Sequence, residues 1–197
     1  MKRFVCSLLF LLGPLLAHVD ALDLTPHPLS TAYNSLRANR YFFDDAGKSM
    51  GFRIDNNMTV KGTSSSVAFK FNDLRNADMQ IKKSPRKPET QFVGEDLEGY
   101  RKDGRAALPE GVTDVQLERE IAAAIPINGW TSYQFVFSYK LLGVNYHRSV
   151  TFLNYNKLEQ LVIDVGAPDA AFELVSLRGY QVLNSLSELQ TESAGST

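Results

Sequence analysis

Cysteine is almost absent from this sequence of 197 residues: the single one, Cys6, lies near the start of the chain. A chain with one cysteine forms no internal disulfide, so its stability has to come from the burial of apolar side chains. Histidine is also rare, with three residues, and no HExxH, CxxC or EF-hand pattern occurs. We therefore expect no metal and no cofactor.

The first 21 residues have the pattern of an export signal. Two basic residues precede an apolar run over residues 4–16, and Ala21 ends the small-residue stretch that a signal peptidase reads. A retained membrane anchor is the alternative, but the run is interrupted by glycine and proline and is shorter than the roughly 20 residues of a membrane span. We interpret residues 1–21 as a signal peptide and expect a periplasmic or secreted protein with no membrane span after cleavage.

The sequence also has no large excess of positive or negative charge. Cleavage removes Lys2, Arg3 and Asp20 from the 21 basic and 22 acidic residues, which leaves 19 basic and 21 acidic ones. A net charge of minus two gives no general attraction to nucleic acid or to an anionic membrane. We expect no nucleic-acid partner.

No catalytic pattern stands out. The hydroxyl-rich segment 62–66 lacks the second glycine of a GxSxG elbow, and the segment 47–51 does not match a phosphate-binding P-loop. His27 and His147 share no ligand spacing. Three acidic pairs fit a turn, a helix start and a solvated strand face better than an acid and base couple: Asp44-Asp45, Glu95-Asp96 and Glu118/Glu120. We therefore expect that the protein is not an enzyme.

The clearest secondary-structure pattern in the sequence lies between Trp130 and Val165. It contains three runs rich in aromatic and β-branched residues, SYQFVFSY, YHRSVTFL and EQLVIDV, separated by KLLGVN and NYNKL. Such runs, bounded by glycine and asparagine, predict consecutive antiparallel strands in a meander.

The rest of the chain predicts helices and hairpins around this meander. A short helix is expected within 24–40, a hairpin over 41–55, a polar loop over 58–66 and strands over 67–71 and 72–83. A helix within 84–111 that stops at Gly104, a long strand within 112–129 and a closing helix over 167–189 follow. Residues 190–197 read as a disordered tail, and residues 22–189 as a single domain.

Strands such as FVFSY and LVIDV are apolar at successive positions, which is expected when both faces of a sheet are covered. The predicted fold class is therefore α+β, an α-β-α sandwich with a mainly antiparallel sheet and helices on both faces.

Element order and several segments resemble the PsbP-like group, which includes the photosystem II extrinsic protein, a Ran-binding nuclear release factor and bacterial exported relatives. The matching segments are PINGWTSYQFVFSY, HRSVTFL, LEQLVIDVGAP and FELVSLRGYQVLNSL, within roughly the last 70 residues. The half before them matches by element order alone. The resemblance implies a small noncatalytic domain that binds or stabilises a protein partner, and it transfers no catalytic residues.

Two sets of residues are candidates for a partner or ligand surface. Trp130 and Tyr146 stand at predicted strand ends, where aromatic side chains meet partners more often than within the core, and His147 follows directly. The second set is a dense basic cluster, which suits an acidic face: Lys82, Lys83, Arg86 and Lys87.

The leading hypothesis is an exported noncatalytic domain that binds a protein or a cell-envelope component. The many aromatic residues allow an alternative, a carrier that holds a small apolar molecule between sheet and closing helix. A hydrolase that uses His147 with a serine or an acid is the third hypothesis.

Overall fold

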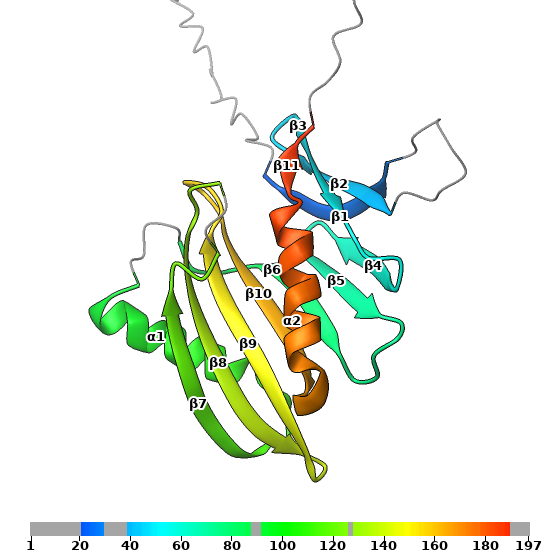
Figure 1. The fold of residues 1–197 in the computed structure, drawn as a ribbon. Helices are drawn as coiled ribbons and strands as arrows, with labels where there is room; N and C mark the ends of the chain where they lie inside the picture. The colour runs from blue at the N-terminus through cyan, green and yellow to red at the C-terminus, as the bar shows by residue number, and fades with distance from the viewer. Residues whose placement is uncertain (1–20, 30–38, 88–91, 126–127, 190–197) are drawn as a thin grey trace, which may run out of the picture.

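The computed structural model describes residues 21–29, 39–87, 92–125 and 128–189 (Figure 1). The helices are α1 (Gly94–Ala106) and α2 (Asp169–Asn184). The strands are β1 (Asp23–Pro28), β2 (Arg40–Asp45), β3 (Lys48–Arg53), β4 (Met58–Thr63), β5 (Ser66–Phe71), β6 (Asp78–Lys83), β7 (Thr113–Ala122), β8 (Thr131–Leu141), β9 (Val144–Asn154), β10 (Gln160–Pro168) and β11 (Ser187–Glu188).

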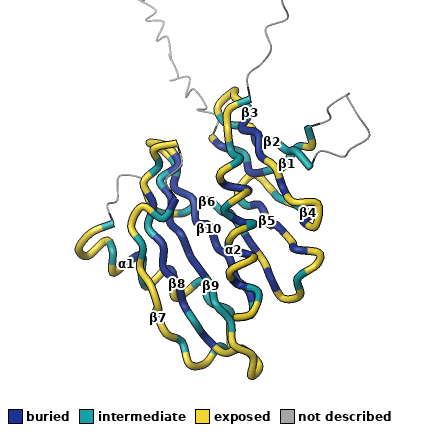
Figure 2. The backbone as a smooth tube through the Cα atoms, in the orientation of Figure 1, coloured by how far each residue is buried: buried dark blue, intermediate teal, exposed yellow. Residues whose placement is uncertain are grey.

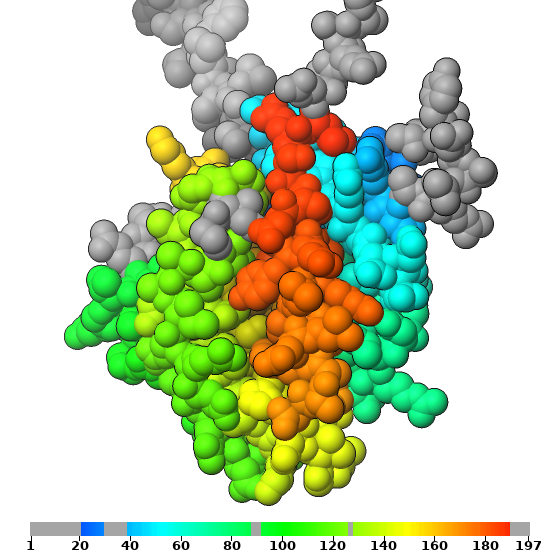
Figure 3. Space-filling view, in the orientation of Figure 1, coloured from blue at the N-terminus to red at the C-terminus, as the bar shows by residue number. Residues whose placement is uncertain are grey.

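The strands form two antiparallel sheets. The larger sheet has seven strands in the order β4-β5-β6-β10-β9-β8-β7, and the smaller has four in the order β1-β2-β3-β11. Helix α1 packs on one face of the large sheet, while α2 and the small sheet pack on the other. Figure 3 shows α2 as a ridge that separates the small sheet from strands β7 and β8. The α-β-α sandwich and its α+β class are confirmed, and the predicted meander is β8-β9-β10.

Each face of the large sheet has its own apolar core. Beneath α1, Tyr100 is fully buried against Phe135, Phe137 and Phe152. A second core on the other face joins α2, the small sheet and strands β4, β5, β6, β8, β9 and β10. The hydroxyl of Tyr155 donates to Asp45 at 2.9 Å and ties the two sheets together.

Cover on two faces explains the burial pattern of the central strand. Every residue of β10 except the last is buried, whereas β5 alternates buried and exposed residues (Figure 2). Helix α1 covers β8 and β9 but leaves this face of β4, β5 and β6 to solvent, where Lys61 and Lys70 are exposed. Alternation of polar and apolar residues is therefore found where cover is one-sided.

Four local predictions were wrong. The segment 58–66, expected to be a polar loop, supplies β4, because Met58 and Val60 point to the core while the polar residues between them face solvent. Pro28 ends strand β1 instead of opening a helix. The rest of that predicted helix, residues 30–38, lies outside the described residues, as do residues 1–20 and the tail 190–197.

The other two errors concern helix ends. Helix α1 continues through Gly104 to Ala106, because Gly104 does not adopt the positive φ of a glycine that ends a helix. Gly104 is buried, and an added Cβ would lie in ordinary contact, at 3.4 Å, with the rings of Phe135 and Phe137. The closing helix ends at Asn184 instead of continuing to 189, and Ser187 and Glu188 pair with β3.

Candidate functional site

A cleft of about 520 Å³ lies beside the first turn of α2, where the helix no longer covers strands β7, β8 and β9. We call it the histidine cleft, because His147 stands at its centre. Its lining also includes the side chains of Asp114, Glu118, Ser138, Lys140 and Asp169. It is the largest of the hollows that we describe.

Two irregularities in β7 bring its carboxylates to this cleft. The pairing register of β7 with β8 shifts between Thr113 and Gln116 and again between Leu117 and Arg119. Asp114 lies in the first bulge with φ of 53°, and Glu118 is the extra residue of the second. A bulge turns a side chain out of the alternation of its strand. Asp114 and Glu118 both line the cleft, and each lies at one of these irregularities.

His147 lies between two carboxylates. Its Nε2 is 3.5 Å from Oε2 of Glu118, and its Nδ1 is 3.1 Å from Oδ1 of Asp169. The second pair is close but out of line for a hydrogen bond, since Nδ1 has no partner of good geometry among the described residues. The ring of Phe172 packs against the imidazole at 5.3 Å between centroids.

The serine of the cleft is not arranged as a nucleophile. Ser138 is directly opposite His147 in the β8–β9 ladder. The nearby Ser138 hydroxyl, and then His147, hold the pKa of Glu118 below its ordinary value. A hydrolytic serine needs a bond to its base, and none joins Ser138 to His147 in the described part of the chain.

The β8–β9 turn next to the cleft breaks two local rules. Leu142 has φ of 51° and a side chain that is 96% exposed, and Gly143 follows with φ of 80°. Positive φ at both positions is the geometry of a tight hairpin turn that prefers Asn-Gly. A leucine there is strained and exposes apolar surface to water, so the site gains no local stability from it.

The structure separates the predicted aromatic residues. Tyr146 borders the cleft, but its ring stacks on Tyr139 at 5.6 Å, on the opposite face of the sheet from His147. Trp130 lies at the other end of β8, roughly 30 Å away at the rise of a strand. There it packs against the core, with its ring 5.2 Å from that of Tyr155.

The space beneath α2 does not suit a carrier. Two hollows on this side of the sheet hold about 10 and 20 Å³, and Trp130 lines the larger. A space of this size accommodates about one water molecule. Neither of these two hollows has room for a small apolar ligand.

The basic cluster is not one surface. Lys82 and Lys83 point to opposite faces of β6, because they are successive strand residues. Lys83 pairs with Glu159 at 3.1 Å, while Arg86 pairs with Asp103 at 2.7 Å and lies over the ring of Tyr100. Lys87 is exposed. Two of the four charges are therefore used inside the fold.

An ion cluster lies on the α1 face, in which Arg148 and Asp164 are largely buried and Asp78 is exposed. Arg148 donates from Nη1 to both carboxylate oxygens of Asp164, at 2.8 and 2.7 Å, and from Nη2 to Asp78. Its guanidinium crosses Gly166, where an added Cβ would lie 2.5 Å from Nη2. Burial raises the pKa of Asp164 to about 6, although Arg148 opposes the shift. Each charge has its partner inside the protein, so we regard the cluster as structural.

The described residues hold no group of three or more histidine, cysteine, aspartate or glutamate side chains arranged to bind a metal ion. No helix among them has the length and apolar character needed to cross a membrane.

The sandwich of one large antiparallel sheet between helices defines the class of this protein. Among solved structures, the chain is similar to the cyanobacterial PsbP (CyanoP) of Synechocystis sp. PCC 6803, with a TM-score of 0.52 and 16% identity over 82% of this chain and 99% of that one. The chain has the PsbP-like fold, which confirms the resemblance drawn from its last strands and helix.

Two further structures are similar at lower scores. LpqN of Mycobacterium tuberculosis, described as involved in cell envelope biogenesis, has a TM-score of 0.45 and 11% identity over 87% of this chain and 93% of that one. PA94 of Pseudomonas aeruginosa, a protein of unknown function described as a putative regulator, has a TM-score of 0.45 and 13% identity over 69% and 100%. No family model and no curated protein matches the sequence.

Sequence reasoning selected His147 but missed the residues that surround it. The two-residue turn at Leu142 and Gly143 fixes the register of β8 against β9, so Ser138 opposite His147 can be counted from the sequence. Glu118 was named only as part of a solvated strand face. Its position depends on a bulge that has no clear sequence signal, and Asp169 reaches the cleft only because α2 packs on β9 and β10.

Proposed function

We propose that this chain acts outside the cytosol as a noncatalytic domain that binds a protein partner through the histidine cleft and the β8–β9 turn. The observation that carries the proposal is Leu142, a strained and 96% exposed apolar residue beside an acidic hollow. Strain and exposure without a gain in the fold are typical of positions kept for an interaction. Val144, on the other side of the turn, is also exposed and extends the apolar surface.

The charges of the cleft define the partner's chemistry. Asp114 is neutralised by Lys140 at 2.9 Å, whereas within the described ranges His147 is the sole ion-pair partner of Glu118 and of Asp169. Complementary charge guides encounter and selects among partners. A protein segment with a lysine or arginine next to an apolar side chain matches both the carboxylates and Leu142.

The buried start of the described chain is compatible with export and cleavage after Ala21. Leu22 is 2% exposed, and its backbone nitrogen lies 3.1 Å from Oε2 of Glu159. Cleavage would turn this nitrogen into an ammonium group beside a carboxylate, a stronger pair than an amide makes. The first residue of the protein recovered from the extracytoplasmic fraction, read by N-terminal sequencing, should be Leu22. A chain that keeps its first 21 residues would contradict this part of the proposal.

Replacement of Leu142 separates binding from folding. Leu142→Asn supplies the residue that the turn prefers, so the free energy of unfolding should rise by about 1 kcal/mol as strain is relieved. Binding to envelope proteins, measured by pull-down with the purified chain, should fall at least tenfold. Leu158→Asn is the matched control, because Leu158 is 70% exposed in the β9–β10 turn and distant from the cleft. The control should bind as the wild type does.

The acidic part of the site has its own test. Glu118→Gln combined with Asp169→Asn should abolish binding to peptides that pair lysine or arginine with leucine, while peptides with glutamate in place of the base should not bind the wild type. Equal recovery of proteins by all variants, or capture of an envelope polymer alone, would contradict the proposal. Turnover of a substrate that is lost in His147→Ala would replace it with the hydrolase hypothesis.

A further inference from the structure

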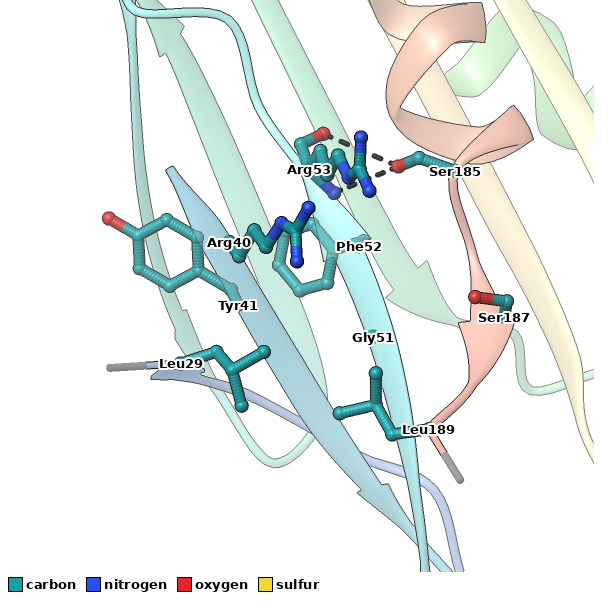
Figure 4. Close-up of a pocket in the computed structure, with 9 residues that line it drawn as sticks. All are labelled: Leu29, Arg40, Tyr41, Gly51, Phe52, Arg53, Ser185, Ser187 and Leu189. Carbon is teal, nitrogen blue, oxygen red and sulfur yellow. Dashed lines mark hydrogen bonds between the residues drawn. The ribbon is translucent and has the colours of Figure 1, made fainter. Parts of the chain in front are cut away.

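A second hollow lies on the outer face of the small sheet, away from the core (Figure 4). Its volume is about 310 Å³, and we call it the arginine pocket. The side chains around it come from the segment after β1, from β2 and β3 and from the end of the chain that the structure describes. They include Leu29, Arg40, Arg53, Ser185, Ser187 and Leu189.

Two arginines occupy directly opposite positions in this pocket. Arg40 pairs with Arg53 in the β2–β3 ladder, so both side chains leave the same face of the small sheet; Figure 4 draws both beside the pocket. Like charges directly opposite one another destabilise a sheet. Within the described residues neither guanidinium forms an ion pair, and Asp44, on the same face of β2, is 3.7 Å from His27 instead.

The backbone holds the two arginines in place. The amide of Arg53 donates to the hydroxyl oxygen of Ser185 at 2.8 Å, which anchors the end of β3 to the end of α2. Ser185 also donates to the carbonyl of Val182 at 2.7 Å, so its hydroxyl is fixed from both sides. The backbone positions of the two arginines are therefore set by a ladder and a helix end.

Gly51 creates the hollow beside them. A Cβ on this residue would lie 2.4 Å from Cδ2 of Leu189, so a larger residue would require this leucine side chain to move from its place across β3. Leu189 and Leu29 then form apolar walls, and the side chain of Ser187, which pairs with Gly51, adds a hydroxyl donor. Two cations, a donor and apolar walls together form a site for an anion that carries an apolar group.

We propose that the arginine pocket binds a phosphate group. A phosphate monoester carries a charge of about −1.5 to −2 at neutral pH and matches two guanidiniums, whereas a carboxylate carries only one negative charge. Guanidinium binds phosphate oxygens in a planar, two-bond geometry. The chain as a whole is slightly acidic, with a formal net charge of −1. The local pair of cations is thus not part of a general basic surface.

The first experiment titrates inorganic phosphate into the purified chain at constant ionic strength and follows the NMR signals of the arginine side chains. The signals of Arg40 and Arg53 should shift and saturate, and Arg40→Gln or Arg53→Gln should weaken the dissociation constant at least tenfold. Arg119→Gln is the matched control, because Arg119 is an exposed arginine on β7 that forms no ion pair with a described residue. It should leave the titration unchanged.

The second experiment separates two sources of the group. Vesicles of phosphatidylcholine with phosphatidic acid should sediment the wild type but not the Arg40→Gln and Arg53→Gln variants if the phosphate belongs to a lipid. Binding of inorganic phosphate without sedimentation would assign a soluble phosphate compound.

Equal shifts with acetate, or with chloride, would overturn the proposal, as would a titration that the two glutamine variants leave unchanged. A retained thermal midpoint shows that these variants fold. Leu142→Asn should not alter phosphate binding, so failure here and failure of the proposed function are distinguishable.

Discussion

The two halves of the large sheet differ in how their strands accommodate charged side chains. Strands β8, β9 and β10 are covered on both faces, and the charged groups buried there, Arg148 and Asp164, are paired with each other. Strands β4, β5 and β6 are covered on one face, and lysines such as Lys70 project to solvent from the other. Burial of charge demands a partner inside the protein, while exposure does not. The histidine cleft lies between these extremes, at the border of the cover that α2 provides.

The largest effect should follow from breaking the buried pair in the covered half. Arg148→Met leaves the carboxylate of Asp164, which is 4% exposed, without its cation. Loss of one partner of a buried pair costs about 3–5 kcal/mol. Denaturation by urea should show this loss, and the double variant with Asp164→Leu should recover most of it. A loss below about 1 kcal/mol would mean that water enters the covered half as freely as the open one.

The stability contributed by the covered half should depend on pH through Asp164. Because burial raises the pKa of Asp164 from 3.8 to about 6, the folded state binds its proton more tightly than the unfolded state does. Its contribution to stability is complete below pH 3.8 and is lost as the pH rises through about 6. The change amounts to at most about 3 kcal/mol.

The comparison with Asp164→Asn isolates this contribution. The difference in free energy of unfolding between wild type and variant should move against the wild type between pH 4 and pH 7. A constant difference over that range would show that Asp164 titrates as an exposed aspartate does.

A smaller loss of stability should follow from a substitution in β10, the covered strand that pairs with β6 of the open half. Gly166→Ala places a Cβ 2.5 Å from Nη2 of Arg148 and forces the guanidinium off its path to Asp78. The free energy of unfolding should fall by about 1–3 kcal/mol. Lys70→Ala, in the open half, should change it by less than about 0.5 kcal/mol. Similar losses in both variants would remove the distinction between covered and open strands.

The sequence predicted most reliably those elements whose structure depends on local residue periodicity and turn residues. The meander, the hairpin of β2 and β3 and the closing helix follow from local periodicity and turn residues, and the structure confirms them. Segment 58–66 was misread because its outward residues are polar and its inward ones few. Strand β11 has two residues, too short for any periodicity to appear.

The candidate sites show the same division. Hairpin turns at Ala46-Gly47 and Leu142-Gly143 fix strand register, so the opposition of Arg40 to Arg53 and of Ser138 to His147 is already written in the sequence. The arginine pair can be found by counting residues outward from the Ala46-Gly47 turn on both strands. The basic cluster at residues 82–87 attracted attention by density alone, and the structure divides it between two faces and two carboxylates.

By itself, then, the sequence determined most strands, the two amphipathic helices and the residues paired across each tight turn. These features depend on the hydrophobic periods of strand and helix, 2 and about 3.6 residues, and on the φ angles of a few turn residues. Only the tertiary structure decided that Asp169 of α2 meets Glu118 of β7 at His147, and that Leu189 folds over Gly51. Those contacts join segments far apart in the chain, and their geometry depends on bulges and on how closely a helix packs, which no local pattern contains.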